Sequence, residues 1–210
     1  MGTLRFTEAL SGWMAAAEDH EVGYRAGRGA GARVRYRATA HIDDLVAFLR
    51  DPRHSAAMTG VVDVAGVGHG MPIEGGRIEM FCRQEGLPAS AKGGSASGGG
   101  EAVRKVIAYH LPFRQGERRY LLQGLKHIEN DPGFDVWKDM TTLYAELLDL
   151  SSAPGGPPIA IGILRIGPLA ALQMGFTFRG AGLRSTVVAT LRFLLFASRE
   201  LRETYGLLPW

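Results

Sequence analysis

The sequence predicts a mainly β (α+β) fold: an antiparallel β-barrel of about eight or more strands, followed by a C-terminal amphipathic helix. Apolar residues recur at every second position in several segments, which is typical of half-buried strands. Most links between these segments are too short for helical crossovers, so neighbouring strands should be antiparallel. Closing the sheet into a barrel would remove the exposed edges that so many strands otherwise leave.

The clearest strand covers residues 33–42, where Val34, Tyr36 and Ala38 alternate with polar residues. The loop 114–117 contains Gly116 and predicts a hairpin between two later strands. With 33–42, eight candidate strands span 33–180, and the others cover 59–66, 76–82, 103–113, 119–128, 140–150, 159–166 and 171–179. The outline is that of a calycin-like barrel. Two strand–DP–strand units, near Asp51 and Asp131, echo each other and suggest an internal duplication.

Two segments fall outside the strand pattern. Residues 85–101 contain almost no bulky apolar side chain, so we expect a mobile Gly/Ser-rich loop, with a functional lid as the alternative. Residues 183–205 form an amphipathic helix that should pack on the barrel or plug one of its mouths. A role at a membrane surface is the less favoured alternative. The stripe expected to pack consists of Val187, Leu191, Leu194, Leu195 and Leu201.

Composition predicts one domain over residues 1–210 and excludes several classes of partner. The chain has 46% hydrophobic residues, which suits a sizeable core, and a net charge of +3. Its scattered arginines are nearly balanced by 21 acidic residues, so we expect no nucleic acid partner. No apolar run is long enough to span a bilayer, which predicts no integral membrane association. No signal peptide is recognisable, and the expected location is the cytoplasm.

The common cofactor and nucleophile motifs are missing. The run from Gly66 to Gly70 continues into Met71 where a dinucleotide fingerprint needs glycine, so a hairpin turn is the better interpretation. Neither a GxSxG motif nor a His pair at metal-ligand spacing is present, and we expect no cofactor and no metal. Alternation places Cys82 inside with Ile78 and Met80, away from His110 and His127, as a buried inert thiol.

The run AYHLPFRQGERRYLLQGLKHIENDPGFDVWKDMTTLY at 108–144 combines an LPF triplet, a Gly-Xaa-Xaa-Xaa-Tyr hairpin, a Gly-Xaa-Lys triplet and a DPG-Xaa-Asp-Xaa-Trp-Xaa-Asp motif before TTL. It resembles a β-rich accessory domain found with GMC (cholesterol-oxidase-like) oxidoreductase and α/β-hydrolase modules in bacterial multidomain proteins. Weaker echoes, FTEALSGW, DPRHSAAMTG and GILRI, extend the resemblance over most of the chain. It implies a context of sterols or other apolar substrates. The flavin and the catalytic residues of those proteins belong to the other modules.

Candidate site residues are polar side chains on otherwise apolar strand faces. Lys126 shares a face with Tyr120 and Leu122, and Glu146 shares one with Tyr144. A buried charge is costly unless it is paired, so these groups either pair or line a cavity, unless their strand faces point to solvent. As catalytic residues we select Glu146, Tyr109 and Lys126, and as ligand-binding residues Tyr36, Tyr144, Trp137, Arg165 and Gln173.

The densest local motif, residues 131–142, favours structure over ligand contact. Asp131-Pro132-Gly133 is strong turn chemistry, and Trp137 is expected to cover one end of the barrel.

Three functions are compatible with this pattern. The first is a cofactor-free bacterial barrel that binds an apolar small molecule, such as a sterol, a lipid or a polyketide-like secondary metabolite. The second is a cofactor-independent isomerase or cyclase that acts on such a metabolite in the same pocket. The third is a docking module for a separate oxidoreductase or hydrolase. The first two predict a deep cavity, and the third predicts an exposed apolar patch on the helix that begins at Leu183.

Overall fold

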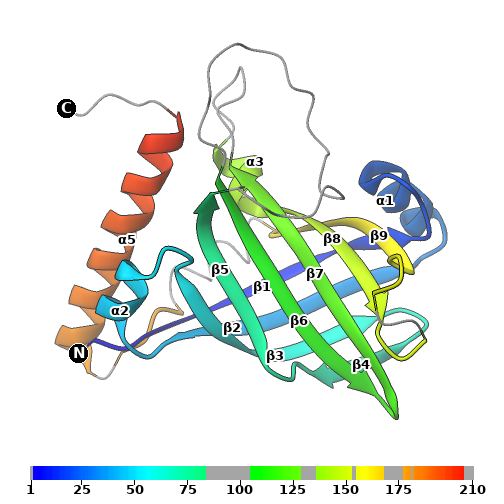
Figure 1. Cartoon of the computed structure of the whole chain (residues 1–210), viewed down its shortest axis with the longest axis horizontal. Helices are drawn as coiled ribbons and strands as arrows, with labels where there is room; N and C mark the ends of the chain where they lie inside the picture. The colour runs from blue at the N-terminus through cyan, green and yellow to red at the C-terminus, as the bar shows by residue number, and fades with distance from the viewer. Residues whose placement is uncertain are drawn as a thin grey trace.

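The computed structural model describes residues 2–83, 105–128, 136–152, 155–167, 177–180 and 182–205. It confirms a mainly β, antiparallel barrel with a C-terminal helix (Figure 1). The strands are β1 (Leu4–Ala15), β2 (Arg33–Ile42), β3 (Ser55–Val64), β4 (Gly68–Pro72), β5 (Gly76–Arg83), β6 (Lys105–Gln115), β7 (Arg118–Ile128), β8 (Thr142–Asp149) and β9 (Ala160–Arg165). The helices are α1 (His20–Gly29), α2 (Leu45–Arg50), α3 (Val136–Thr141) and α5 (Leu183–Tyr205).

The strands form a 9-stranded sheet in the order β2-β1-β9-β8-β7-β6-β5-β3-β4, and pairing of β2 with β3 closes the ring. β4 lies outside the ring as an extra partner of β3. The predicted hairpins are present: β6 runs directly into β7 through Gly116, and β3 turns into β4 through Gly66. Both glycines have positive φ, at 58° and 80°, which residues with a Cβ adopt at a cost.

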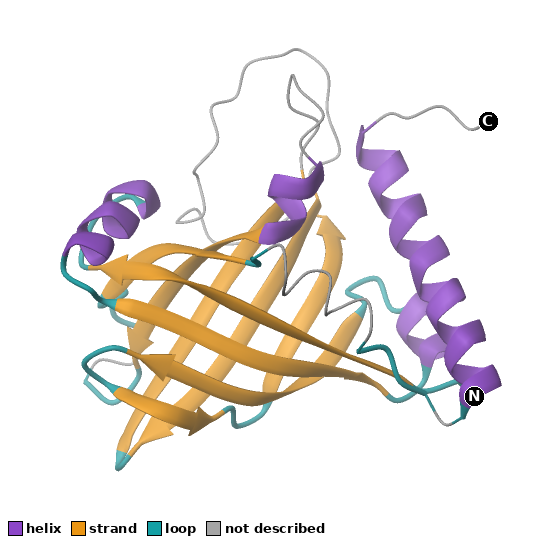
Figure 2. Cartoon of the chain, turned by 180° about the vertical axis from the view of Figure 1, so that it is seen from behind, coloured by secondary structure: helices purple, strands orange, loops and turns teal. Residues whose placement is uncertain are grey.

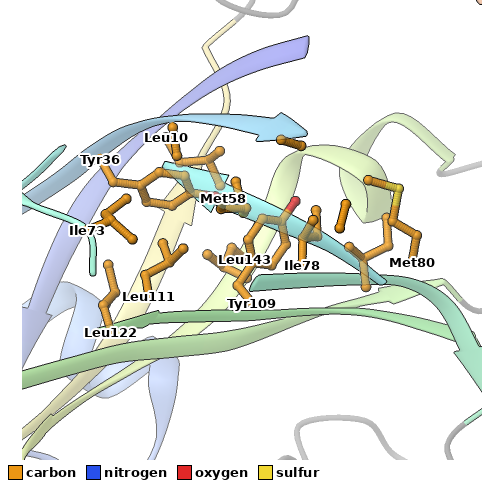
Figure 3. Packing of buried hydrophobic residues seen from close by; sticks show 14 of the residues in the cluster. Leu10, Tyr36, Met58, Ile73, Ile78, Met80, Tyr109, Leu111, Leu122 and Leu143 are labelled. Atoms are coloured by element: carbon orange, nitrogen blue, oxygen red, sulfur yellow. The ribbon is translucent and has the colours of Figure 1, made fainter. Parts of the chain in front are cut away.

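Alternation directs one face of each strand into the barrel. In β2, Val34, Tyr36, Ala38, Ala40 and Ile42 are all buried, whereas Arg33, Arg35 and Arg37 are exposed. The interior is filled by apolar side chains from every strand of the ring, and Figure 3 shows a part of this packing. The fold is therefore held by the burial of one face of each strand.

The first strand is the main element that alternation did not predict. β1 buries Leu4, Phe6 and Leu10, but Glu8 and Gly12 occupy the inward positions between and after them and interrupt the apolar pattern. The short helices α1, α2 and α3 were not predicted either, and α3 includes Met140 and Thr141, where the strand expected at 140–150 was to begin. Most of the strand expected at 171–179 lies outside the described residues, although Arg179 forms a β-bridge with Arg5.

Cys82 does not lie inside with Ile78 and Met80 as alternation predicts. The register of β5 against β6 shifts between Glu79 and Cys82, and Phe81 has a positive φ of 55°. This bulge places Phe81 in the core and turns the Cys82 thiol away, where it donates to the carbonyl of Arg53 at 3.3 Å. Burial raises the pKa of Cys82 to about 11, so the thiol stays protonated at neutral pH.

Helix α5 runs beside α2 at one end of the barrel, well away from α1 (Figures 1 and 2). It packs through Phe193 and Phe196, whose rings contact Phe6, Phe48 and Phe81. Within the described part of the chain, no helix combines the length and apolar character needed to span a membrane.

The predicted packing stripe of α5 is largely wrong. Val187, Leu191, Leu194 and Leu195 are 49–65% exposed, and only Leu201 of the predicted set packs against the core. The two phenylalanines lie on the other side of the helix, and their larger rings fill the end of the barrel instead.

Helix α1 covers the outer face of β1 and β9 through two glycines one turn apart. Asp19 caps the helix by accepting hydrogen bonds from the backbone of Glu21 and Val22. Gly23 and Gly27 are buried, and a Cβ on Gly27 would lie 2.6 Å from the carbonyl oxygen of Met14. The close approach of α1 to the sheet therefore depends on glycine, which has no side chain, at positions 23 and 27.

We predict that Gly27→Ala destabilises the fold by about 1–3 kcal/mol, because the added methyl group meets strand backbone that cannot move aside. Gly29→Ala is the matched control, since a Cβ there meets nothing within 4 Å. It should leave stability unchanged or raise it by up to about 1 kcal/mol through helix propensity. Urea unfolding followed by circular dichroism measures both, and equal effects of the two variants would contradict the close packing of α1.

Candidate functional site

Four polar side chains meet inside the barrel, in a cluster formed by Glu8, Tyr36, Tyr109 and Lys126. The Tyr36 hydroxyl donates to one oxygen of Glu8 at 2.8 Å, and the Tyr109 hydroxyl donates to the other at 3.1 Å. The Lys126 ammonium lies 3.4 Å from that second oxygen. It also lies 4.9 Å from the centre of the Tyr109 ring, as a cation–π contact. Each of the four residues is at most 4% exposed.

Four different strands position this cluster. Glu8 is on β1 and Tyr36 on β2, and these strands pair so that Glu8 lies opposite Ala38. Tyr109 is on β6 and Lys126 on β7, and Tyr109 lies opposite Gly124. Because Ala38 and Gly124 are small, the neighbouring long side chains can extend across the interior toward the carboxylate.

The surroundings of the cluster are apolar. Figure 3 shows Tyr36 and Tyr109 among Leu10, Met58 and Leu143, which are almost fully buried. Burial lowers the pKa of Lys126, and the charge of Glu8 opposes this effect. Burial and the nearby carboxylate raise the pKa of Tyr36 and of Tyr109 well above the usual value, so both phenols remain hydrogen-bond donors at neutral pH.

Three of the residues selected from the sequence meet in this cluster: Tyr36, Tyr109 and Lys126. The residue that joins them, Glu8, was missed. Its signal was a single acidic residue at an inward position between Phe6 and Leu10, in a strand that alternation did not predict. A carboxylate in such a position needs buried donors, and the strands that supply them could be found only once the barrel order was known.

Glu146, Tyr144 and Arg165 lie on the outer face of the barrel, so they do not share the interior with Lys126. Glu146 accepts a hydrogen bond from the side-chain amide of Gln123 at 2.9 Å. The ring of Tyr144 contacts His20 of α1, with 5.6 Å between the ring centres. The strand faces that carry Glu146 and Tyr144 on β8 and Arg165 on β9 therefore point away from the barrel interior, which was the alternative left open by the sequence. On β8 the residues that face the core are Leu143, Ala145 and Leu147.

Arg165 lies over the ring of Tyr24, 5.3 Å from its centre, and borders an open outer groove of about 570 Å³. Arg35 lines the same groove, where it pairs with Asp63 at 2.5 Å. The arginines around the groove are exposed, and a surface ion pair of this kind contributes little to stability.

Two other selected residues also fail to join the cluster. Trp137 is 62% exposed on α3 and does not cover the end of the barrel as expected. Its backbone carbonyl accepts a hydrogen bond from the Thr141 hydroxyl at 2.6 Å, within the short helix. Gln173 lies outside the described residues.

Within the ranges that the structure describes, no three or more His, Cys, Asp or Glu side chains are grouped so as to hold a metal ion. No protein-family model matches this chain, and comparison with the curated proteins and the solved structures gives no match. The resemblance to the accessory domain of GMC oxidoreductases therefore stays a prediction from sequence.

We predict that Glu8→Gln and Lys126→Met each cost about 3–5 kcal/mol of unfolding free energy, because each variant leaves the other group buried without its counter-charge. The double variant Glu8→Gln/Lys126→Met should lose less unfolding free energy than the sum of the losses in the two single variants. Glu146→Gln, which alters the hydrogen bond between Gln123 and Glu146 on the outer face of the barrel, should change stability by less than about 1 kcal/mol. Urea titrations of all four variants measure the coupling, and additive losses would contradict a paired interior cluster.

We also predict that the stability of the Glu8→Gln variant depends on pH. In Glu8→Gln the carboxylate no longer raises the pKa of Lys126, so burial lowers that pKa further. The unfolded chain then binds more protons than the folded chain at pH values between the lowered pKa and the ordinary one, about 10.4. Stability of Glu8→Gln should therefore rise with pH below the ordinary lysine pKa, more steeply than that of the wild type. Stability that does not change with pH would show that burial does not lower the pKa of Lys126 in this variant.

Proposed function

We propose that this protein is a cofactor-free barrel that binds an apolar small molecule, such as a sterol, a lipid or a polyketide-like metabolite. A carbonyl or hydroxyl group of the ligand would be held by Glu8, Tyr36, Tyr109 and Lys126. Because core side chains fill the interior in this structure, binding would require some of them to move aside and open the predicted cavity. The observation that carries the proposal is the convergence of these four polar side chains inside an otherwise apolar barrel.

A purely structural role explains this cluster less well. Apolar residues of similar volume can often replace a buried ion pair without loss of stability, so such a pair is weak evidence for a stabilising role. In this core, leucine, isoleucine and methionine already supply most of the filling. Ligand sites in barrels instead combine an apolar wall with a few convergent polar groups.

The ligand would reach the cluster from the end of the barrel that carries α5. Phe6 lies one inward position before Glu8 on β1 and contacts Phe193 of α5, with 5.6 Å between the ring centres. Between α5 and Glu8 the interior is packed with phenyl rings, so a ligand entering from this end would have to displace Phe6 and Phe193 before it met the polar cluster. This order suits a molecule that is mostly apolar with one oxygen at its leading end.

The geometry also favours a second function, a cofactor-independent isomerase or cyclase. A carboxylate with two phenols and an ammonium group within 3.4 Å contains a proton acceptor, proton donors and a cation. Glu8 would take a proton from carbon next to a ligand carbonyl, and Lys126 and Tyr109 would stabilise the negative charge on the carbonyl oxygen. Returning the proton to another carbon would complete an isomerisation.

The binding function predicts that a 3-ketosteroid binds more tightly than its 3-deoxy analogue by about tenfold or more, since one hydrogen bond to a buried polar group separates the two. Tyr109→Phe and Tyr36→Phe should each weaken binding of the ketone and leave binding of the deoxy compound unchanged. Tyr144→Phe is the matched control on the outer face and should have no effect. Native mass spectrometry and isothermal titration calorimetry measure these affinities.

Equal affinity for the two steroids, or an equal loss in Tyr144→Phe, would overturn binding at the cluster. Organic extraction of the purified protein, with identification of any retained apolar metabolite, indicates which compounds to test next.

Turnover is tested separately by exchange of the protons next to the ketone in deuterated water, followed by NMR. The isomerase predicts exchange that Glu8→Gln abolishes and Glu146→Gln retains. Tight binding of the ketone without exchange by the wild-type protein would leave the binding function and exclude the isomerase for that compound.

A further inference from the structure

Helix α5 presents an apolar surface that the fold does not use. Five residues form what we call the outer face of α5, and they recur at spacings of one, three and four, which places them on one side of a helix. They are Val187, Val188, Leu191, Leu194 and Leu195, each 49–65% exposed. Contiguous exposed apolar residues of this kind mark an interaction site.

The opposite side of α5 already accounts for its attachment to the barrel. Ala189 and Phe193 are buried there, and Phe196 contacts Phe48 and Phe81. Figures 1 and 2 show the helix at the edge of the molecule, with α2 and the barrel on one side only. The outer face is therefore available to a partner.

The apolar surface continues onto α2. A hollow of about 190 Å³ separates the two helices, lined by Leu45, Val46, Val188 and Ala189 with Arg192 at its side. Val46 is 40% exposed and extends the patch beyond α5. An apolar hollow beside a guanidinium group suits a hydrocarbon segment attached to a negatively charged group.

Charge around the outer face is strongly positive. All four arginines of α5 are exposed: Arg184, Arg192, Arg199 and Arg202. The two acidic residues of α5, Glu200 and Glu203, bind the ammonium of Lys105 on β6 at 2.7 and 2.9 Å. The barrel thus holds both carboxylates of the helix, and of the four arginines Arg199 also pairs with Glu203, at 3.1 Å. Arg184, Arg192 and Arg202 keep the surroundings of the apolar residues positive.

We propose that the outer face of α5 binds the surface of an anionic lipid bilayer. Apolar residues flanked by arginines on one side of a helix are the pattern of helices that lie in the membrane interface. The apolar side chains would enter the region between headgroups and acyl chains, and the arginines would contact lipid phosphates. This inference does not depend on a ligand inside the barrel.

A second copy of this chain is the less suitable occupant. Two outer faces packed together would bring the arginines of both helices into one interface. Glu203 already pairs with Arg199 at 3.1 Å while it binds Lys105, so Arg184, Arg192 and Arg202 are the charges that such an interface would have to neutralise. The only carboxylates that α5 offers them are the two that hold Lys105, which is 3% exposed and costly to leave unpaired. An anionic bilayer supplies the missing negative charge.

Vesicle co-sedimentation tests the proposal with the full chain. Wild-type protein should sediment with vesicles of equal parts phosphatidylcholine and phosphatidylglycerol, much less with phosphatidylcholine alone, and progressively less as salt is raised. Leu191→Glu combined with Leu195→Glu should weaken binding to the anionic vesicles by about tenfold or more.

The matched control is Val22→Glu combined with Val61→Glu. It adds the same charge at two valines that are 56% and 40% exposed and lie away from α5. This control should retain most of the binding. No sedimentation of the wild type with anionic vesicles, or an equal loss in the control, would overturn the proposal.

Light scattering after size-exclusion chromatography distinguishes the other occupants. A monomeric wild type that binds vesicles supports the bilayer. A dimer that dissociates in the Leu191→Glu/Leu195→Glu variant would assign the face to a second copy. A purified oxidoreductase or hydrolase that binds the face while anionic vesicles do not would assign it to protein docking.

Discussion

A carboxylate inside a closed barrel is stable only when other strands bring it donors and positive charge. Glu8 meets this requirement with Tyr36 from the neighbouring strand and with Tyr109 and Lys126 from strands on another part of the ring. Those strands face β1 across the interior only because pairing of β2 with β3 closes the sheet. Barrel closure and the polar cluster thus depend on each other.

The outside of the barrel is organised by a different constraint, namely how closely helices can approach it. Helix α1 lies directly on strand backbone because Gly23 and Gly27 have no side chains to separate the two layers. Helix α5 is instead held at a distance by phenyl rings and by the ion pairs of Lys105. The first arrangement covers the wall of the barrel, and the second covers one end.

Alternation predicted most of the ring because each strand such as β2 buries one full face, and local pattern is then sufficient. It did not predict β1, where the acidic Glu8 breaks the apolar series, or the position of Cys82, which a single bulge reverses. Tyr36, Tyr109 and Lys126 were selected because they are polar groups on inward faces. Glu146 satisfied the same local criterion but faces outward, and only strand order and tilt decide between the two cases.

The local sequence pattern also could not predict which side of α5 packs on the barrel, because both sides of this helix carry apolar residues. Only the shape of the barrel end decides that Phe193 is buried and Leu194 is exposed. With apolar residues on both sides, α5 lies between the barrel end and whatever binds its outer face. A lipid bound to its outer face, as proposed above, would be separated from the phenyl rings on its inner face by one helix, about 10 Å across. If both proposals hold, an apolar compound dissolved in the bilayer would travel only around this one helix to reach the barrel, with little of its surface exposed to water.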